Sequence, residues 1–304
     1  MMSTKNLSSM AAFALLLLAL SHVSASAQNR VTVMMWNVHG GNPPTPPGKG
    51  TFNCAPRNIP DPQTSMMKIK NVVQMYNNSH PTAKIDAITL QEVHRNQAVK
   101  LAQLLKYPAP HFIWAARCDK TDRQLDYGTA ILTPHKFALK TYYNIHTPKA
   151  DRERNTPEYT RLVLGSFKVH GQWVRVYSAH LTSNPVERQK QLDDIFKRIP
   201  PAGIRSVLTG DFNMPPTVPG RNSSATYDSV TRNFIDTWAK KNPTNLGGGI
   251  TAPYRETPQR IDYIFLRKLK GEETGFNILS SGVINTGRVS DHLPVVTVLT
   301  FKSL

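Results

Sequence analysis

Short apolar runs that begin or end on a small polar cluster recur along this chain of 304 residues. Residues 31–36 are apolar apart from one threonine and lead into Asn37, and residues 87–90 lead into Gln91 and Glu92. Short apolar runs bounded by polar or turn residues are typical of buried β-strands. Because the end of one strand lies beside the start of an antiparallel neighbour, such polar residues can share a single edge of a sheet.

Helical and strand-like segments are interleaved along the chain. The predicted helices cover 64–78, 98–105, 185–198 and 228–240. The further strand-like runs cover 111–116, 127–133, 137–146, 160–169, 173–180, 206–209, 261–267, 276–284 and 293–301. Some neighbouring runs are joined directly and others through a helix. This mixture predicts packed mixed sheets covered by helices rather than a purely parallel doubly wound sheet.

The first 27 residues are predicted to be a secretory signal. Lys5 precedes the apolar run 11–20, and Ala25-Ser26-Ala27 supplies the small residues of a cleavage site before Gln28. The run is too short to span a bilayer, so we expect no stable membrane insertion. Residues 28–304 show no internal repeat or dividing linker and are expected to form one exported domain, secreted or, in a Gram-negative host, periplasmic.

The chain is strongly basic. Its formal charge is +17, and removal of the signal takes away only Lys5, which leaves +16. A charge of this size favours a polyanionic partner such as nucleic acid or an anionic membrane surface, although a generically basic exported protein remains an alternative.

Several polar residues at the strand ends are of types that bind a divalent cation or a phosphate group. Glu92 is the best candidate metal ligand, because a carboxylate after a buried strand can bind Mg²⁺ while the ion keeps several waters. Asp211 and Asp291 are candidates for a second cation position or for aligning the attacking water. Asn37 and Asn213 can orient a phosphate oxygen without adding negative charge. Mn²⁺ or Ca²⁺ could replace Mg²⁺.

These residues stand in motifs that resemble the endonuclease/exonuclease/phosphatase superfamily, the deoxyribonuclease I-like fold. The motifs follow the family's order over about 31–301: Trp36-Asn37, Gln91-Glu92, Asp126-Tyr127-Gly128, Arg161, Ser178-Ala179-His180, Gly210-Asp211-Phe212-Asn213, Arg260-Ile261-Asp262-Tyr263 and Ser290-Asp291-His292-Leu293-Pro294. The resemblance implies a four-layer α/β sandwich, with two mostly antiparallel central sheets flanked by helices and a divalent-metal phosphoesterase site.

The resemblance also implies roles for the histidines. His292 would pair with Asp262 and accept a proton from water, while His180 would assist the leaving oxygen; the two roles could be exchanged. A carboxylate that fixes the ring tautomer helps each histidine. Asp126 is the candidate for His180, with Asp119 and Asp122 in the same loop as alternatives. Arg161 occupies the place of the family's phosphate-contacting arginine.

The predicted substrate is DNA. Arg95 is a candidate substrate contact, and Arg221 and Arg260 are further cationic candidates near phosphates. The alternative is a secreted phospholipid or phosphoinositide hydrolase, such as a sphingomyelinase-like enzyme, that uses the same site. Such an enzyme would need apolar loops for membrane entry, and the Pro- and Gly-rich segment 40–63 offers only Phe52.

Cys54 and Cys118 are the only cysteines, and we predict that they form a disulfide in the exported protein. Closing so long a loop stabilises the fold by about 4 kcal/mol in the chain-entropy picture. Intact-mass analysis of the non-reduced protein after thiol alkylation should show no added label. Two labelled thiols would contradict the prediction.

Overall fold

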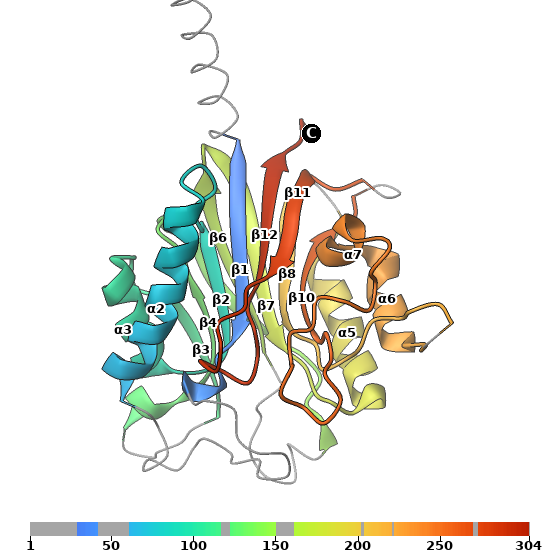
Figure 1. The fold of residues 1–304 in the computed structure, drawn as a ribbon, viewed down its shortest axis with the longest axis horizontal. Coiled ribbons are helices and arrows are strands. Elements are labelled where there is room, and N and C mark those ends of the chain that lie inside the picture. The colour runs from blue at the N-terminus through green and yellow to red at the C-terminus, as the bar shows by residue number, and fades with distance from the viewer. Residues whose placement is uncertain are drawn as a thin grey trace, which may run out of the picture.

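The computed structural model describes residues 29–41, 61–116, 122–149, 161–201, 204–220, 222–269 and 273–303. Two six-stranded sheets pack face to face, and helices cover their outer faces (Figure 1). The predicted four-layer α/β sandwich is therefore confirmed. Cys54, Cys118, Asp119 and Arg221, as well as the predicted signal segment 1–27, lie outside the described residues.

The first sheet has the strand order β11-β12-β1-β2-β4-β3. Its strands are β1 (Arg30–Asn37), β2 (Ala87–His94), β3 (His111–Ala116), β4 (Tyr127–Leu132), β11 (Phe276–Val283) and β12 (Val295–Phe301). Only β1 and β2 run parallel, and the other pairs are antiparallel.

The second sheet has the order β5-β6-β7-β8-β10-β9. Its strands are β5 (Phe137–Asn144), β6 (Arg161–Val169), β7 (Gln172–His180), β8 (Ser206–Asp211), β9 (Phe234–Asp236) and β10 (Asp262–Arg267). Here too one pair is parallel, β7 with β8. Each sheet is thus mostly antiparallel, as predicted.

The helices lie on opposite sides of the paired sheets (Figure 1). Helices α2 (Pro62–Ser79) and α3 (Arg95–Leu105) belong to the layer beside the first sheet. Helices α5 (Pro185–Arg198), α6 (Ala225–Asn233) and α7 (Thr237–Lys241) lie on the side of the second sheet. Asp61 and Asn184 cap α2 and α5 through their side chains, each directly before a proline at the first helical position.

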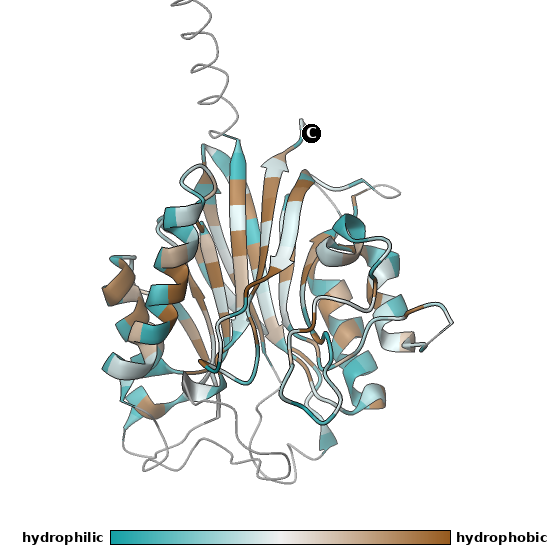
Figure 2. Cartoon of the chain, viewed as in Figure 1, coloured by the Kyte–Doolittle hydropathy of each residue, from teal (hydrophilic) through white to brown (hydrophobic). Residues whose placement is uncertain are grey.

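The central strands are apolar on both faces because both faces are covered. On β1, Val33 and Met35 join the core between the sheets, whereas Met34 and Trp36 join the core under α2 and α3. Figure 2 shows the same arrangement, with apolar residues on the strands and polar residues on the outer sides of the helices. This explains why these runs read as continuous apolar stretches instead of alternating ones.

The prediction of one continuous helix over 228–240 was wrong, because a short strand interrupts it. The chain forms α6, then the short strand β9, then α7. Residues 234–236 pair with β10, with Phe234 opposite Arg267 and Asp236 opposite Phe265. The Asp236 carboxylate then caps α7 by accepting from the amides of Trp238 and Ala239 (2.9 and 3.2 Å). Sheet pairing therefore overrides a continuous helical pattern.

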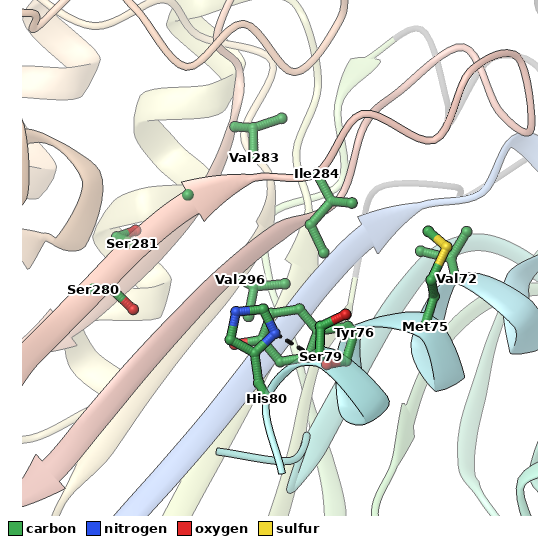
Figure 3. Close-up of a pocket in the computed structure, with 11 residues that line it drawn as sticks. Val72, Met75, Tyr76, Ser79, His80, Ser280, Ser281, Val283, Ile284 and Val296 are labelled. Carbon is green, nitrogen blue, oxygen red and sulfur yellow. Dashed lines mark hydrogen bonds between the residues drawn. The ribbon is translucent and has the colours of Figure 1, made fainter. Parts of the chain in front are cut away.

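An open apolar groove runs between α2 and β11 (Figure 3). Met75 lines it and is 60% exposed, and the Tyr76 ring stacks on His80 with centroids 4.2 Å apart. The opposite wall includes Val283 and Ile284.

Among the described residues no helix is both long and apolar enough to span a bilayer.

Arg260 and Asp236 form a buried ion pair that fastens the loop before β10 to the second sheet. Arg260 is 2% exposed, and its guanidinium lies 2.6 Å from Asp236 and over the Tyr263 ring. Although burial alone would lower the pKa of Arg260, the Asp236 charge raises it. Arg260 is committed to this pair, so the prediction that it lies near substrate phosphates was wrong.

We predict that Asp236→Ala destabilises the protein by about 3–5 kcal/mol, because it leaves a buried guanidinium without its partner. Lys190→Ala, which breaks an exposed pair with Glu187, should cost at most about 1 kcal/mol. Urea unfolding followed by circular dichroism compares the two. Similar losses in both variants would contradict a structural role for the buried pair.

Candidate active site

Side chains from five neighbouring strands of the second sheet line up across one of its ends. His180 on β7 is opposite Asp211 on β8, and Asp211 is opposite Asp262 on β10. The pairing of β6 with β7 continues this row to Arg161, which is opposite Asn144 on β5. Residues directly opposite one another point to the same side of a sheet, so the sequence motifs converge in space.

The first sheet contributes Asn37 and Glu92 to this row. The Asn37 Nδ2 donates to Glu92 Oε1 (2.8 Å) and to Asp211 Oδ2 (3.1 Å), which links the two sheets at the site. Glu92 has a left-handed φ of 53° and lies at a register shift between β2 and β4. Such a bulge redirects a side chain out of the regular alternation, and here it brings the carboxylate to the site.

Glu92 is held as a carboxylate. The Tyr127 hydroxyl donates to its Oε2 (2.5 Å), and His180 Nε2 lies 3.8 Å from its Oε1. Burial would raise the pKa of Glu92, but His180, His39 and the hydrogen bonds from Asn37 and Tyr127 lower it to about 2. Sequence reasoning gave Tyr127 no role, although it lies within a motif that carries the resemblance.

The turn after β8 depends on Gly210. A Cβ at this position would lie 1.9 Å from the Ala179 carbonyl oxygen, so only glycine lets β8 approach β7 this closely. The following Asp211 is 1% exposed, and its Oδ1 accepts from the amide of Asn213 (2.8 Å). Its Oδ2 lies 3.6 Å from His180 Nε2 and 3.8 Å from His292 Nε2. Asp211 thus stands between the two histidines.

Asn213 is fixed from three directions. Its Nδ2 donates to the Leu181 carbonyl (2.9 Å) and lies 3.4 Å from His180 Nε2. Its own carbonyl accepts from Arg188 (2.5 Å), a residue only 5% exposed. Its side-chain oxygen accepts from Arg255 (3.1 Å). Sequence reasoning missed both arginines, because neither belongs to a motif.

His292 and Asp262 form the predicted pair, with Nδ1 and Oδ2 2.8 Å apart and both residues buried. The Thr251 hydroxyl accepts from the Asp262 amide (3.2 Å), and the His292 carbonyl accepts from the Trp36 indole (3.0 Å). Burial alone would lower the pKa of His292. The charges of Asp262, Asp211 and Asp291 outweigh it and raise this pKa to about 10.

Asp291 is the most exposed of the four carboxylates at the site. Its Oδ1 is 3.6 Å from His39 Nδ1, and its side chain is 35% exposed. No candidate ligand group among the described residues combines Asp291 with Glu92. His39, which carried no recognisable pattern, therefore belongs to the surroundings of the site.

The two arginines predicted to contact substrate both lie over aromatic rings. The Arg161 guanidinium donates to Asn144 Oδ1 (2.7 Å) and stacks between Trp114 and Tyr142, with ring distances of 5.5 and 5.4 Å. Arg95 covers the Phe112 ring and lies 3.8 Å from Asp126.

Asp126 was the candidate partner of His180. His180 Nε2 lies near the carboxylates of Glu92 (3.8 Å) and Asp211 (3.6 Å). His94, the neighbour of Arg95, is completely buried and so cannot contact a nucleic-acid groove.

Two groups of side chains have the composition and spacing of a metal site. One is Glu92, His180 and Asp211, and the other is Asp211, Asp262 and His292; within each group the potential ligand atoms all lie within 4.8 Å of one another. Carboxylate oxygens with an imidazole suit Mg²⁺ or Mn²⁺. The donor set therefore fits a divalent cation, and Asp211 is common to both groups.

Comparison with known families agrees with this geometry. Residues 34–292 match the Endonuclease/Exonuclease/phosphatase family. The chain belongs to this family. Members of the endonuclease/exonuclease/phosphatase superfamily are typically metal-dependent phosphoesterases.

Solved structures share the fold at low sequence identity. An endonuclease/exonuclease/phosphatase from Beutenbergia cavernae superposes with a TM-score of 0.64 at 21% identity, covering 90% of this chain and 72% of the other. TDP2 from D. rerio complexed with a single-strand DNA product gives 0.59 at 18% identity, covering 89% and 99%. An endonuclease/exonuclease/phosphatase from Bacteroides vulgatus gives 0.61 at 16%, covering 90% and 99%. Among curated proteins none matches this chain.

We predict that His180→Ala and His292→Ala each lower kcat for phosphodiester hydrolysis by roughly 10²-fold or more, the scale for loss of a general acid or base. Hydrolysis of bis(p-nitrophenyl) phosphate with Mg²⁺ or Mn²⁺ measures this directly. His170→Asn, at an exposed turn with a left-handed φ that asparagine tolerates, is the control. Near-normal turnover by either site variant would contradict its assignment.

Proposed function

We propose that this protein is an exported, Mg²⁺-dependent endonuclease that hydrolyses DNA phosphodiester bonds. The observation that carries the proposal is the position of Asp211. Its carboxylate lies within 3.8 Å of both histidines and accepts a hydrogen bond from Asn37. Acid–base groups, oxygen ligands and an amide donor therefore surround one small volume, as attack on a phosphate requires.

Glu92, Asp211 and Asp262 are the carboxylates that would hold the cation. A bound divalent cation neutralises the charge that develops on a phosphate and eases deprotonation of water. Asn37 donates to two of these carboxylates, and Asn213 lies beside His180, so both amides hold groups that would act on the phosphate. Their neutral side chains do so without adding repulsion toward an anionic substrate.

The two histidines divide the proton transfers. His292, oriented by Asp262, accepts the proton of the attacking water, and His180 assists the leaving oxygen. The carboxylates of Asp262, Asp211 and Asp291 raise the pKa of His292. Positive charge placed among these carboxylates lowers that pKa and favours the neutral imidazole, which is the form that can act as a base.

The net charge favours nucleic acid as the substrate. A charge of +16 after signal removal attracts a polyphosphate chain, and a DNA product is bound in one of the structurally similar proteins. Large apolar side chains that are exposed in the described residues lie on α2, β5, β7, α5 and β11, not on loops around the site. This distribution gives the lipid-hydrolase alternative no specific support.

Nicking of supercoiled plasmid tests the proposal, because a single cut changes the mobility of the molecule. We expect nicking with Mg²⁺ at low salt, none with excess chelator, and a KM for duplex DNA that rises with salt by a log–log slope of about 0.9 per phosphate contact. Glu92→Gln should require more Mg²⁺ for half-maximal activity. Phosphate or phosphocholine release from lipid vesicles, with no nicking under any of these conditions, would overturn the DNA assignment.

A further inference from the structure

Arg255 is an exposed cationic residue that touches the site but belongs to none of its motifs. It lies in the loop between α7 and β10, and its Nη2 donates to Asn213 Oδ1 (3.1 Å). Asn213 in turn lies against His180 through its Nδ2 (3.4 Å). The guanidinium is therefore one side chain away from a predicted catalytic histidine, on the solvent side of the site.

The loop that carries Arg255 is anchored at its base. Ala252 and Gln259 exchange backbone hydrogen bonds (2.9 and 3.3 Å) and form an isolated antiparallel bridge. The Thr251 carbonyl accepts from the amide of Leu293 (2.7 Å), the residue after His292. Arg255 is thus presented from the tip of a short, closed loop. Preorganisation of this kind reduces the entropy that a long side chain loses on binding.

A second contact holds the same loop against the segment before His292. The Tyr254 hydroxyl donates to the Gly287 carbonyl (2.9 Å), and the Arg288 guanidinium lies over the Tyr254 ring at 5.5 Å. Two arginines and one aromatic ring therefore share this rim. Cations beside an aromatic face are a common way to contact a nucleic-acid strand.

The charge around the site explains why a cation is needed here. Glu92, Asp211, Asp262 and Asp291 surround the predicted reaction centre, and they repel a polyanion that extends beyond the bound metal. A guanidinium has five N–H donors in a planar fork that matches a phosphate. The described contacts of Arg255 use one donor, on Asn213. As far as the described residues go, the other N–H groups of this exposed guanidinium have no protein acceptor.

We propose that Arg255 binds the phosphate next to the scissile one in a nucleic-acid strand. The inference rests on the proposed nuclease function, since only a polyphosphate chain offers that second phosphate. Arg255 would fix the strand relative to His180 because one guanidinium contacts both the substrate and Asn213. The competing explanation is that Arg255 merely orients the Asn213 amide.

Steady-state kinetics of Arg255→Ala separate these explanations when two substrates are compared. A duplex oligonucleotide has neighbouring phosphates, whereas bis(p-nitrophenyl) phosphate has only the scissile one. We expect KM for the duplex to rise about tenfold, which is the scale of losing one charge-assisted hydrogen bond. The increase in KM should be smaller for the small diester. The log–log salt slope for the duplex should fall by about 0.9.

Two further variants complete the comparison. Arg255→Lys keeps the charge without the planar fork, so we expect it to keep most of the salt slope and to recover only part of the affinity. Arg232→Ala removes an exposed arginine of α6, in the outer helix layer, and serves as the matched control. Its KM and salt slope should equal those of the unmodified protein.

Equal losses of kcat on both substrates, with an unchanged salt slope, would show that Arg255 only orients Asn213 and would overturn the proposal. So would duplex kinetics indistinguishable from those of the unmodified protein. Fluorescence anisotropy with labelled duplex in chelator separates this failure from failure of the proposed function. If the unmodified protein cleaves no DNA, weaker binding by Arg255→Ala would still support the phosphate contact, and equal Kd values would remove it.

Discussion

The hydrogen bonds of the Asn37 amide to Glu92 and Asp211 join the two halves of the molecule at the site. Asn37 and Glu92 come from the first sheet, and Asp211 comes from the second. Three polar groups at the seam of a sandwich would be costly to bury without partners. Here the Asn37 amide donates hydrogen bonds to both carboxylates. The relative position of the sheets therefore also fixes the distance between the two carboxylates.

Two features of the backbone, the close approach at Gly210 and the register shift at Glu92, bring the carboxylates to this seam. Gly210 allows β8 to come close to β7, which sets Asp211 opposite His180. The register shift at Glu92 turns its carboxylate toward the same place from the first sheet. Buried donors such as Tyr127 and Arg188 then hold the charged groups and the loop after β8 in place.

The sequence predicted the helices and strands well, because apolar runs and the polar or turn residues that bound them are local signals. The apolar runs gave nearly every strand, and the pairing of His292 with Asp262 followed from the family resemblance and is present in the structure. The failures depended on tertiary contacts. Only pairing with β10 makes 234–236 a strand, and only burial beside Asp236 removes Arg260 from the surface.

Residues outside the motifs could not be found by the same reasoning. His39 reaches Asp291 after a tight turn, and Arg255 reaches Asn213 across 42 positions of sequence. Neither has a local signature that would distinguish it from an ordinary surface residue. The roles assigned to individual histidines likewise depend on charges that several distant segments bring together.

The contact between the Trp36 indole and the His292 carbonyl spans 256 positions, nearly the whole described chain. The Ser290 hydroxyl reaches the Asn37 carbonyl over a similar separation (2.9 Å). The candidate site therefore closes only when the last strand docks beside the first, and a partly folded chain in which these strands have not met lacks both contacts. The arrangement of the site thus depends on the two ends of the described chain coming together, so it forms late in folding.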